Sequence, residues 1–177
     1  MGGYVDLDKA IRKIPGFPKP GILFYDITSI LTDLDAFTYC VDGLVEPFRG
    51  AHVDLVAAIE SRGFLFAPSV GQRLGVGVVL VRKAGKLPGE VYSRTYDLEY
   101  GTDTVEMHKS DLPAGKRILI VDYLVATGGT LKAAADVIAE AGCTAVGVSC
   151  VIGLPDLDYV AKLAPLYVHT LIDFEGA

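Results

Sequence analysis

Apolar residues along the chain gather in short continuous runs, separated by segments with helical periodicity. A run that is apolar at every position is typical of a parallel strand buried on both faces of a sheet. Alternation of such strands with helices predicts a doubly wound α/β fold, whose ligands bind at the carboxyl ends of the strands. We expect strands at residues 55–59, 77–82, 117–121, 145–152 and 166–172, and helices at about 33–49, 64–74, 131–141 and 156–163.

Two segments depart from this alternation. We expect a short helix at residues 4–13, and residues 14–21 are too rich in proline and glycine for regular structure. Residues 90–96 and 104–108 read as two strands inserted between elements of the sheet, and such an insertion is often a flap over a site. We therefore expect a single domain over residues 1–177, with an N-terminal hood segment (1–50) and a flap (84–110).

Composition narrows the classes of function. The 177 residues suit one domain with a substantial core, and a formal net charge of −6 argues against general nucleic-acid binding. No apolar run approaches the roughly 20 residues that cross a bilayer, and the N-terminus lacks the pattern of a secretion signal. Cys40, Cys143 and Cys150 form no Cys-x-x-Cys pair, so we expect buried, reduced thiols in a cytoplasmic protein.

The most informative stretch follows the predicted strand 117–121. Asp122 ends the apolar run, and Ala126-Thr127-Gly128-Gly129-Thr130 leads into the helix at 131–141. Glycines let backbone N–H groups converge, and a helix N-terminus attracts anions, so this loop predicts a phosphate site. An ordinary strand-to-helix turn is the alternative. The loop is not a Walker A motif, because no lysine follows its glycines.

Cations lie at the ends of two other predicted strands. Arg62 follows the strand at 55–59, and the strand at 77–82 ends in Arg82, with Lys83 and Lys86 directly after it. Because the carboxyl ends of parallel strands share one edge, we expect these side chains near the glycine-rich loop, where they suit phosphate oxygens. Solvated surface cations are the alternative for both groups.

Together these stretches resemble the adenine phosphoribosyltransferases, which have the type I phosphoribosyltransferase fold. Five motifs follow the order of that family: Phe17-Pro-Lys-Pro-Gly-Ile-Leu-Phe-Tyr-Asp-Ile-Thr28, Glu60-Ser-Arg-Gly-Phe-Leu-Phe66, Val81-Arg-Lys-Ala-Gly-Lys-Leu-Pro88, Tyr96-Asp-Leu-Glu-Tyr-Gly101 and Ala126-Thr-Gly-Gly-Thr130. The matches run from about residue 14 to 141, and the last 35 or so residues resemble the family only in pattern.

The resemblance implies a magnesium-dependent transferase of purine salvage, in which adenine and 5-phosphoribosyl-1-pyrophosphate give AMP and pyrophosphate. It implies Mg²⁺ held mainly by the substrate rather than by protein side chains, a homodimer, and a cis peptide before the matching arginine, here Ser61–Arg62. Glu99 is the implied catalytic acid/base. The implied binding residues are Asp122, Tyr123, Ala126, Thr127, Gly128, Gly129, Thr130, Arg62, Arg82, Lys83 and Lys86 for the ribosyl donor, and Leu23, Phe24 and Tyr25 for adenine.

Tyr123 departs from the family, which usually carries a second acid at this position. If that acid makes a charged hydrogen bond to the ribose, its loss costs about 1.5–3 kcal/mol, or about 10- to 150-fold in binding or rate. On this interpretation, Tyr123→Asp strengthens the use of donor or magnesium. Tyr25 stands where some members carry arginine, which alters stacking around the base rather than the reaction.

Two other functions compete with adenine transfer. One is a degenerate phosphoribosyltransferase fold that binds the ribosyl donor or a nucleotide without turnover. The other is an enzyme of the same scaffold that acts on guanine, xanthine or orotate. The acidic chain disfavours a nucleic-acid-binding regulator, and the Phe17-Pro-Lys-Pro-Gly21 segment and the flap motif favour adenine.

Overall fold

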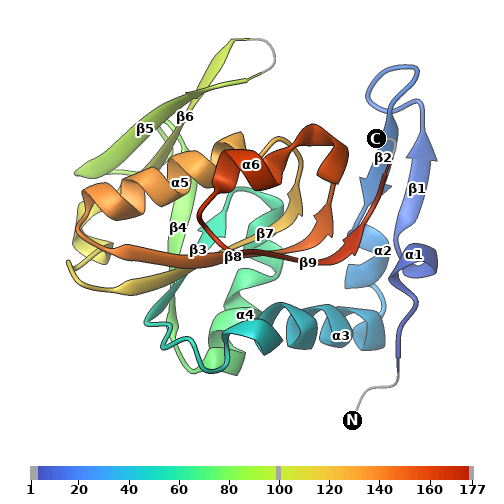
Figure 1. Cartoon of the computed structure of the whole chain (residues 1–177), viewed down its shortest axis with the longest axis horizontal. Coiled ribbons are helices and arrows are strands. Elements are labelled where there is room, and N and C mark those ends of the chain that lie inside the picture. Colours follow the sequence, from blue (N-terminus) through green and yellow to red (C-terminus); the bar gives the residue numbers. More distant parts are fainter. Residues whose placement is uncertain (1–3, 99–100, 176–177) are drawn as a thin grey trace.

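A computed structural model of the chain describes residues 4–98 and 101–175. Its central feature is a seven-stranded sheet in the order β5-β6-β4-β3-β7-β8-β9 (Figure 1). The last five strands in this order, from β4 to β9, pair in parallel with their neighbours, as the continuous apolar runs predict. In contrast, β5 and β6 pair antiparallel with each other. The strands are β3 (Leu55–Ile59), β4 (Gly77–Lys83), β5 (Val91–Asp97), β6 (Thr102–His108), β7 (Arg117–Val125), β8 (Thr144–Gly153) and β9 (Val168–Asp173).

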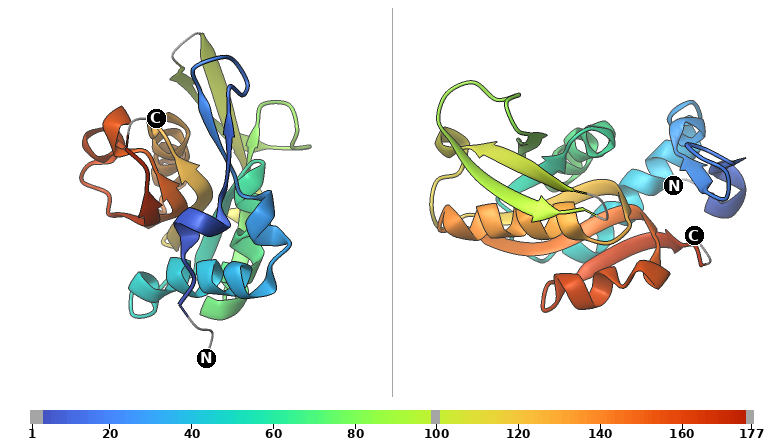
Figure 2. Two further views of the ribbon diagram at one scale, coloured as in Figure 1. Left: turned by 90° about the vertical axis from the view of Figure 1, so that its right-hand side faces the viewer. Right: turned by 90° about the horizontal axis from the view of Figure 1, so that it is seen from above.

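Helices cover both faces of this sheet, so the fold is a doubly wound α/β sandwich (Figures 1 and 2). One face carries α3 (Leu34–Val45) and α4 (Ala67–Leu74), and the other carries α5 (Gly129–Glu140) and α6 (Tyr159–Leu163). Each face has its own cluster of buried apolar side chains. None of the helices in the described part of the chain has the length and apolar character needed to cross a membrane.

Helix boundaries follow local chemistry. Asp33 and Asp35 are both candidates for the N-cap of the helix expected from about residue 33, and the cap of α3 is Asp33, whose carboxylate accepts the N–H groups of Asp35 and Ala36. The predicted helix at 64–74 is instead a 3₁₀ turn, Arg62–Leu65, followed by α4, with Pro68 in the first turn of α4. The predicted helix at 156–163 likewise divides into a 3₁₀ turn, Pro155–Leu157, and α6.

The predicted N-terminal helix at 4–13 is wrong in extent. Asp6 caps a single turn, α1 (Leu7–Ala10), and the chain then extends into β1 (Arg12–Pro15). β1 pairs antiparallel with β2 (Leu23–Asp26), and α2 (Thr28–Leu31) follows. Pairing with a later segment therefore overrides the local helical pattern. This hairpin stands beside the carboxyl ends of the parallel strands (Figure 1).

The predicted strands of the 84–110 insertion form the β5–β6 hairpin, which is not separate from the sheet. β6 pairs antiparallel with the end of β4, at Arg82–Glu106 and Lys83–Val105. The hairpin also lies along α5 (Figure 2). It is thereby held at both its base and one side.

The strand order reverses between β3 and β7. These neighbours are parallel, yet β3 leads into α4 on one face and β7 leads into α5 on the other. In doubly wound sheets such a reversal opens a crevice for ligands at the carboxyl ends of the strands. β7 continues to Val125 rather than ending at residue 121 as predicted, so Asp122 and Tyr123 lie within the strand.

Candidate active site

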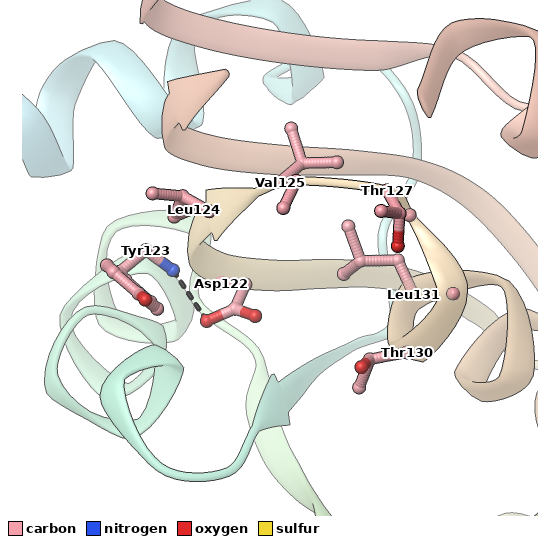
Figure 3. Close-up of a pocket in the computed structure, with 10 residues that line it drawn as sticks. Asp122, Tyr123, Leu124, Val125, Thr127, Thr130 and Leu131 are labelled. Atoms are coloured by element: carbon pink, nitrogen blue, oxygen red, sulfur yellow. Dashed lines mark hydrogen bonds between the residues drawn. The ribbon is translucent and has the colours of Figure 1, made fainter. Parts of the chain in front are cut away.

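Residues 122–131 line a pocket of about 180 Å³ at the carboxyl end of β7 (Figure 3). Gly128 precedes α5 in a left-handed conformation, with φ of +78°, which favours glycine. The 12-residue helix α5 begins at Gly129 and directs its first N–H groups toward the loop. The structure thus brings together the predicted loop residues Ala126, Thr127, Gly128, Gly129 and Thr130 with Asp122 and Tyr123.

Asp122 is the acidic residue of this pocket. Its side chain is buried, and Oδ1 accepts the N–H of Tyr123 at 2.7 Å. Burial raises the pKa of Asp122 to about 7, although the hydrogen bond from Tyr123 and the charges of Arg62 and Lys83 oppose the shift. The carboxyl group can therefore change its charge near neutral pH when a ligand arrives.

Arg62, in the turn that follows β3, contacts Tyr123 of the pocket lining. Its Nη2 donates a hydrogen bond to the phenol oxygen of Tyr123, and its Cζ lies 4.0 Å from the Tyr123 ring centroid. The close approach depends on Gly63, because a Cβ there would lie 2.8 Å from the carbonyl oxygen of Val121. The predicted meeting of the β3 and β7 ends is confirmed.

Lys83, at the end of β4, is linked to the loop through Tyr96. Its ammonium group pairs with Asp103 and donates to the Tyr96 hydroxyl at 2.8 Å. The Tyr96 hydroxyl lies 2.8 Å from the hydroxyl of Thr130, at the start of α5. The β5–β6 hairpin is therefore linked to the glycine-rich loop through a hydroxyl pair.

Arg82 and Lys86 point to Glu60 at the end of β3. Arg82 Nε lies 3.3 Å from the carboxylate, Lys86 forms an ion pair with it, and the Lys83 N–H donates to it at 2.9 Å. Burial opposes the charge of Glu60, but these donors outweigh burial and lower its pKa to about 2. Both cations thus share an internal anion in this structure.

The three residues expected at the base differ in placement. Leu23 is exposed on β2, and the Phe24 ring packs against Phe17 and lies 5.6 Å from Arg62 Cζ. Tyr25 instead is buried and stacks on Phe174, with ring centroids 4.2 Å apart. The side chain of Tyr25 is therefore not available to a ligand beside Phe24.

One expectation is wrong, and another concerns a residue that the structure does not describe. The cis peptide is Glu60–Ser61, one bond before the expected Ser61–Arg62. Glu99, the expected acid/base, lies outside the described residues. Cys40, Cys143 and Cys150 are buried free thiols, as expected.

The sequence interpretation missed apolar residues of the pocket. Leu124, Val125 and Leu131 line it alongside the polar groups. The signal was the return of apolar residues after Asp122, which marks a continuing strand. Within the described ranges, no three His, Cys, Asp or Glu side chains gather to hold a metal ion.

Comparisons with known proteins identify the family of this chain. The profile of the phosphoribosyl transferase domain matches residues 31–168. An adenine phosphoribosyltransferase of Treponema pallidum is 54% identical over 174 residues, which cover 98% of this chain and 92% of the relative. One from Thermobifida fusca is 50% identical over 165 residues, covering 93% and 94%.

Solved structures give the same result. Adenine phosphoribosyltransferase from Thermoanaerobacter pseudethanolicus superposes with a TM-score of 0.91 at 46% identity, covering 94% of this chain and 97% of that one. The Saccharomyces cerevisiae enzyme, in complex with adenine and D-2,5-dideoxy-2,5-imino-altritol 1,6-bisphosphate, gives 0.88 at 40% identity, covering 94% and 96%. The chain belongs to the adenine phosphoribosyltransferase family.

Proposed function

We propose that this protein transfers the 5-phosphoribosyl group of 5-phosphoribosyl-1-pyrophosphate to adenine, giving AMP and pyrophosphate. N9 of adenine attacks C1′ of the sugar, the C1′–O bond breaks, and its electrons leave with pyrophosphate. One observation carries the proposal: a glycine-rich loop at the start of α5 lies at the strand-order reversal, where Arg62 contacts Tyr123 and Lys83 is linked to Thr130 through the Tyr96 hydroxyl. Relatives named for this activity support the choice of adenine.

The loop at residues 126–130 is the proposed site of the 5′-phosphate. The first turn of α5, which has no side-chain cap among the described residues, supplies N–H groups and the positive end of a helix dipole. Thr127 and Thr130 add hydroxyl donors at the same pocket. A phosphate seated there places the ribose over Asp122, whose carboxylate can accept bonds from the sugar hydroxyls.

The residues present fit Mg²⁺ that is held mainly by the substrate. Mg²⁺ prefers oxygen ligands and keeps several waters, so one or two carboxylates suffice beside substrate phosphates. Asp122 offers such an oxygen, and its raised pKa means that a nearby cation favours its ionised form. When bound, the ion supplies positive charge that neutralises the departing pyrophosphate.

Arg62, Arg82, Lys83 and Lys86 are the proposed ligands of the pyrophosphate. The last three pair with Glu60 or Asp103 in this structure, so an incoming polyanion has to compete with those carboxylates. Because the transition state resembles an oxocarbenium ion with a polyanionic leaving group, cations act at pyrophosphate and carboxylates act near the sugar.

Adenine is proposed to lie beside Leu23 and the ring of Phe24, with the backbone near Tyr25 reading its edge. The β1–β2 segment then serves as the hood, and the β5–β6 hairpin serves as a flap that brings Glu99 to the imidazole edge of the purine as acid/base. Closure of the flap excludes water that would otherwise hydrolyse the donor. We further expect a cytoplasmic homodimer.

The test is conversion of adenine to AMP with donor and Mg²⁺, run in parallel with guanine, hypoxanthine and orotate. Adenine-selective turnover is the expected result. Turnover of another base in preference to adenine would reassign the substrate. Donor binding without turnover on any base would show that the protein is a binding protein rather than an enzyme.

A further inference from the structure

Tyr123 occupies the position where the family resemblance implies a second acid against the ribose. Its phenol oxygen instead accepts a hydrogen bond from Arg62 Nη2, and its ring lies under the guanidinium at 4.0 Å from Cζ. Both contacts join the end of β7 to the turn that follows β3, across the strand-order reversal. Tyr123 therefore contacts Arg62 through a hydrogen bond and through a cation–π interaction.

Arg62 keeps most of its donors for a ligand. A guanidinium carries five N–H donors in a fixed plane. Within the described part of the chain, the Tyr123 oxygen is the one hydrogen-bond acceptor that the Arg62 side chain reaches. Phe24 lies 5.6 Å from its Cζ, so aromatic rings from β2 and β7 both pack near the same cation. The plane of the guanidinium is thereby fixed while its remaining donors are unpaired.

Charge distinguishes tyrosine from aspartate here. A carboxylate paired with Arg62 would cancel its charge, whereas a neutral phenol orients the guanidinium and leaves its charge intact. Aspartate is also shorter, so its oxygens would end well before the position of the Tyr123 oxygen. The chain already holds Arg82, Lys83 and Lys86 in ion pairs with Glu60 and Asp103, whereas Arg62 forms no ion pair among the described residues and acts on Asp122 through its charge alone.

We propose that Tyr123 is a positioning residue that holds Arg62, with its charge uncancelled, to receive the anionic ribosyl donor. This inference rests on the proposed function and deepens it. It also reverses the expectation drawn from the sequence, in which Tyr123 was a poor substitute for a ribose-binding acid. On the structural argument, Tyr123→Asp weakens donor binding, because it removes both contacts that orient Arg62.

A double-mutant cycle tests the proposal. Parent, Tyr123→Phe, Arg62→Ala and the double variant are titrated with 5-phosphoribosyl-1-pyrophosphate and Mg²⁺ by calorimetry. Tyr123→Phe keeps the ring and loses only the acceptor, so donor affinity should fall about tenfold in the parent background and by less than about twofold once Arg62 is absent. Tyr167→Phe, a change at an exposed tyrosine that does not line the pocket, is the control and should leave donor affinity unchanged.

Steady-state kinetics separate positioning from a merely structural role. Tyr123→Phe should raise KM for the donor and leave kcat at saturating donor within about twofold of the parent, since Arg62 remains to be recruited by the ligand. Tyr123→Asp should raise KM for the donor as well. Equal losses of affinity from Tyr123→Phe with and without Arg62, or tighter donor binding by Tyr123→Asp, would overturn the proposal in favour of direct contact with the sugar.

A measurement without ligand keeps this inference apart from the proposed function. Tyr123→Phe should lower the urea midpoint of the ligand-free protein only when Arg62 is present. If Tyr123 and Arg62 are coupled in both urea unfolding and donor binding but adenine is not turned over, the positioning role is supported and the proposed transferase activity is refuted. If adenine is turned over but Tyr123 and Arg62 are coupled in neither measurement, the transferase activity is supported and the positioning role is refuted.

Discussion

Asp122 lies in a buried environment that favours its neutral form. Replacing it with asparagine should therefore reveal the free energy that is lost when the carboxyl group ionises. The carboxyl group is buried in β7, and burial raises its pKa from 3.8 to about 7. The Asp122→Asn substitution keeps a side-chain oxygen that can accept the Tyr123 N–H, so it removes the charge and preserves the hydrogen bond. The variant therefore isolates the free energy of ionisation.

The sign follows from linkage between proton binding and folding. Because the folded pKa is raised, the stability that Asp122 contributes is fully present below about pH 4 and is lost as pH rises through 7. Between about pH 4.5 and pH 8, the parent should lose about 3 kcal/mol of unfolding free energy relative to Asp122→Asn.

Urea unfolding of ligand-free protein at several pH values measures this difference. Asp35→Asn, which removes an exposed carboxylate, is the control and should show little of the pH dependence. A parent-minus-Asp122→Asn difference that stays flat from pH 4.5 to 8 would refute the reasoning, because Asp122 would then ionise equally in the folded and unfolded chains.

Three further changes test separate contacts. Gly63→Ala places a Cβ 2.8 Å from the Val121 carbonyl oxygen and should cost about 1–3 kcal/mol in urea unfolding, whereas Gly50→Ala meets no atom within 4 Å and should be close to neutral. Glu99→Gln should lower kcat by about 10²- to 10⁴-fold with donor affinity nearly unchanged by calorimetry, and equal turnover would remove Glu99 from the mechanism. Tyr96→Phe removes the hydroxyl that links the hairpin to the loop, so KM for the donor should rise; an unchanged KM would show that the link has no role in binding.

The parallel strands and the site loop could be predicted because their signals are local. Continuous apolar runs mark strands buried on both faces, and Leu55–Ile59 was predicted with the bounds that β3 has. Asp33 begins α3 because a cap depends on adjacent residues. The glycine-rich loop needs a positive φ at Gly128. Glycine is the residue that adopts such a φ most readily, so the residue type itself indicated the turn.

Two of the errors involve pairing with distant residues. β1 forms because β2 lies beside it, and the local sequence alone favoured a helix. β7 runs beyond Asp122 because β8 offers Cys150, Ile152 and Gly153 as partners. A polar pair, Asp122-Tyr123, looks like a strand end when the partner strand is unknown.

The same limit applied to the site. The sequence identified Arg62 and Tyr123 as site residues, yet nothing in either segment indicated that they bond to each other. Likewise, Glu60 was not recognised as the shared partner of Arg82 and Lys86. Residue types predicted the chemistry of the site, and long-range contacts decided which of its charges are paired.

The most direct measurement of the central claim is AMP formation from adenine, donor and Mg²⁺ by the parent and by Asp122→Asn. The variant should retain the fold and gain stability near pH 8, and its urea unfolding at that pH checks that a loss of activity does not come from unfolding. We predict AMP formation by the parent and a rate at least about 100-fold lower for the variant, since one charged contact in the transition state contributes about 3 kcal/mol. No AMP from the parent, or equal rates, would contradict the assignment of this pocket as the active site.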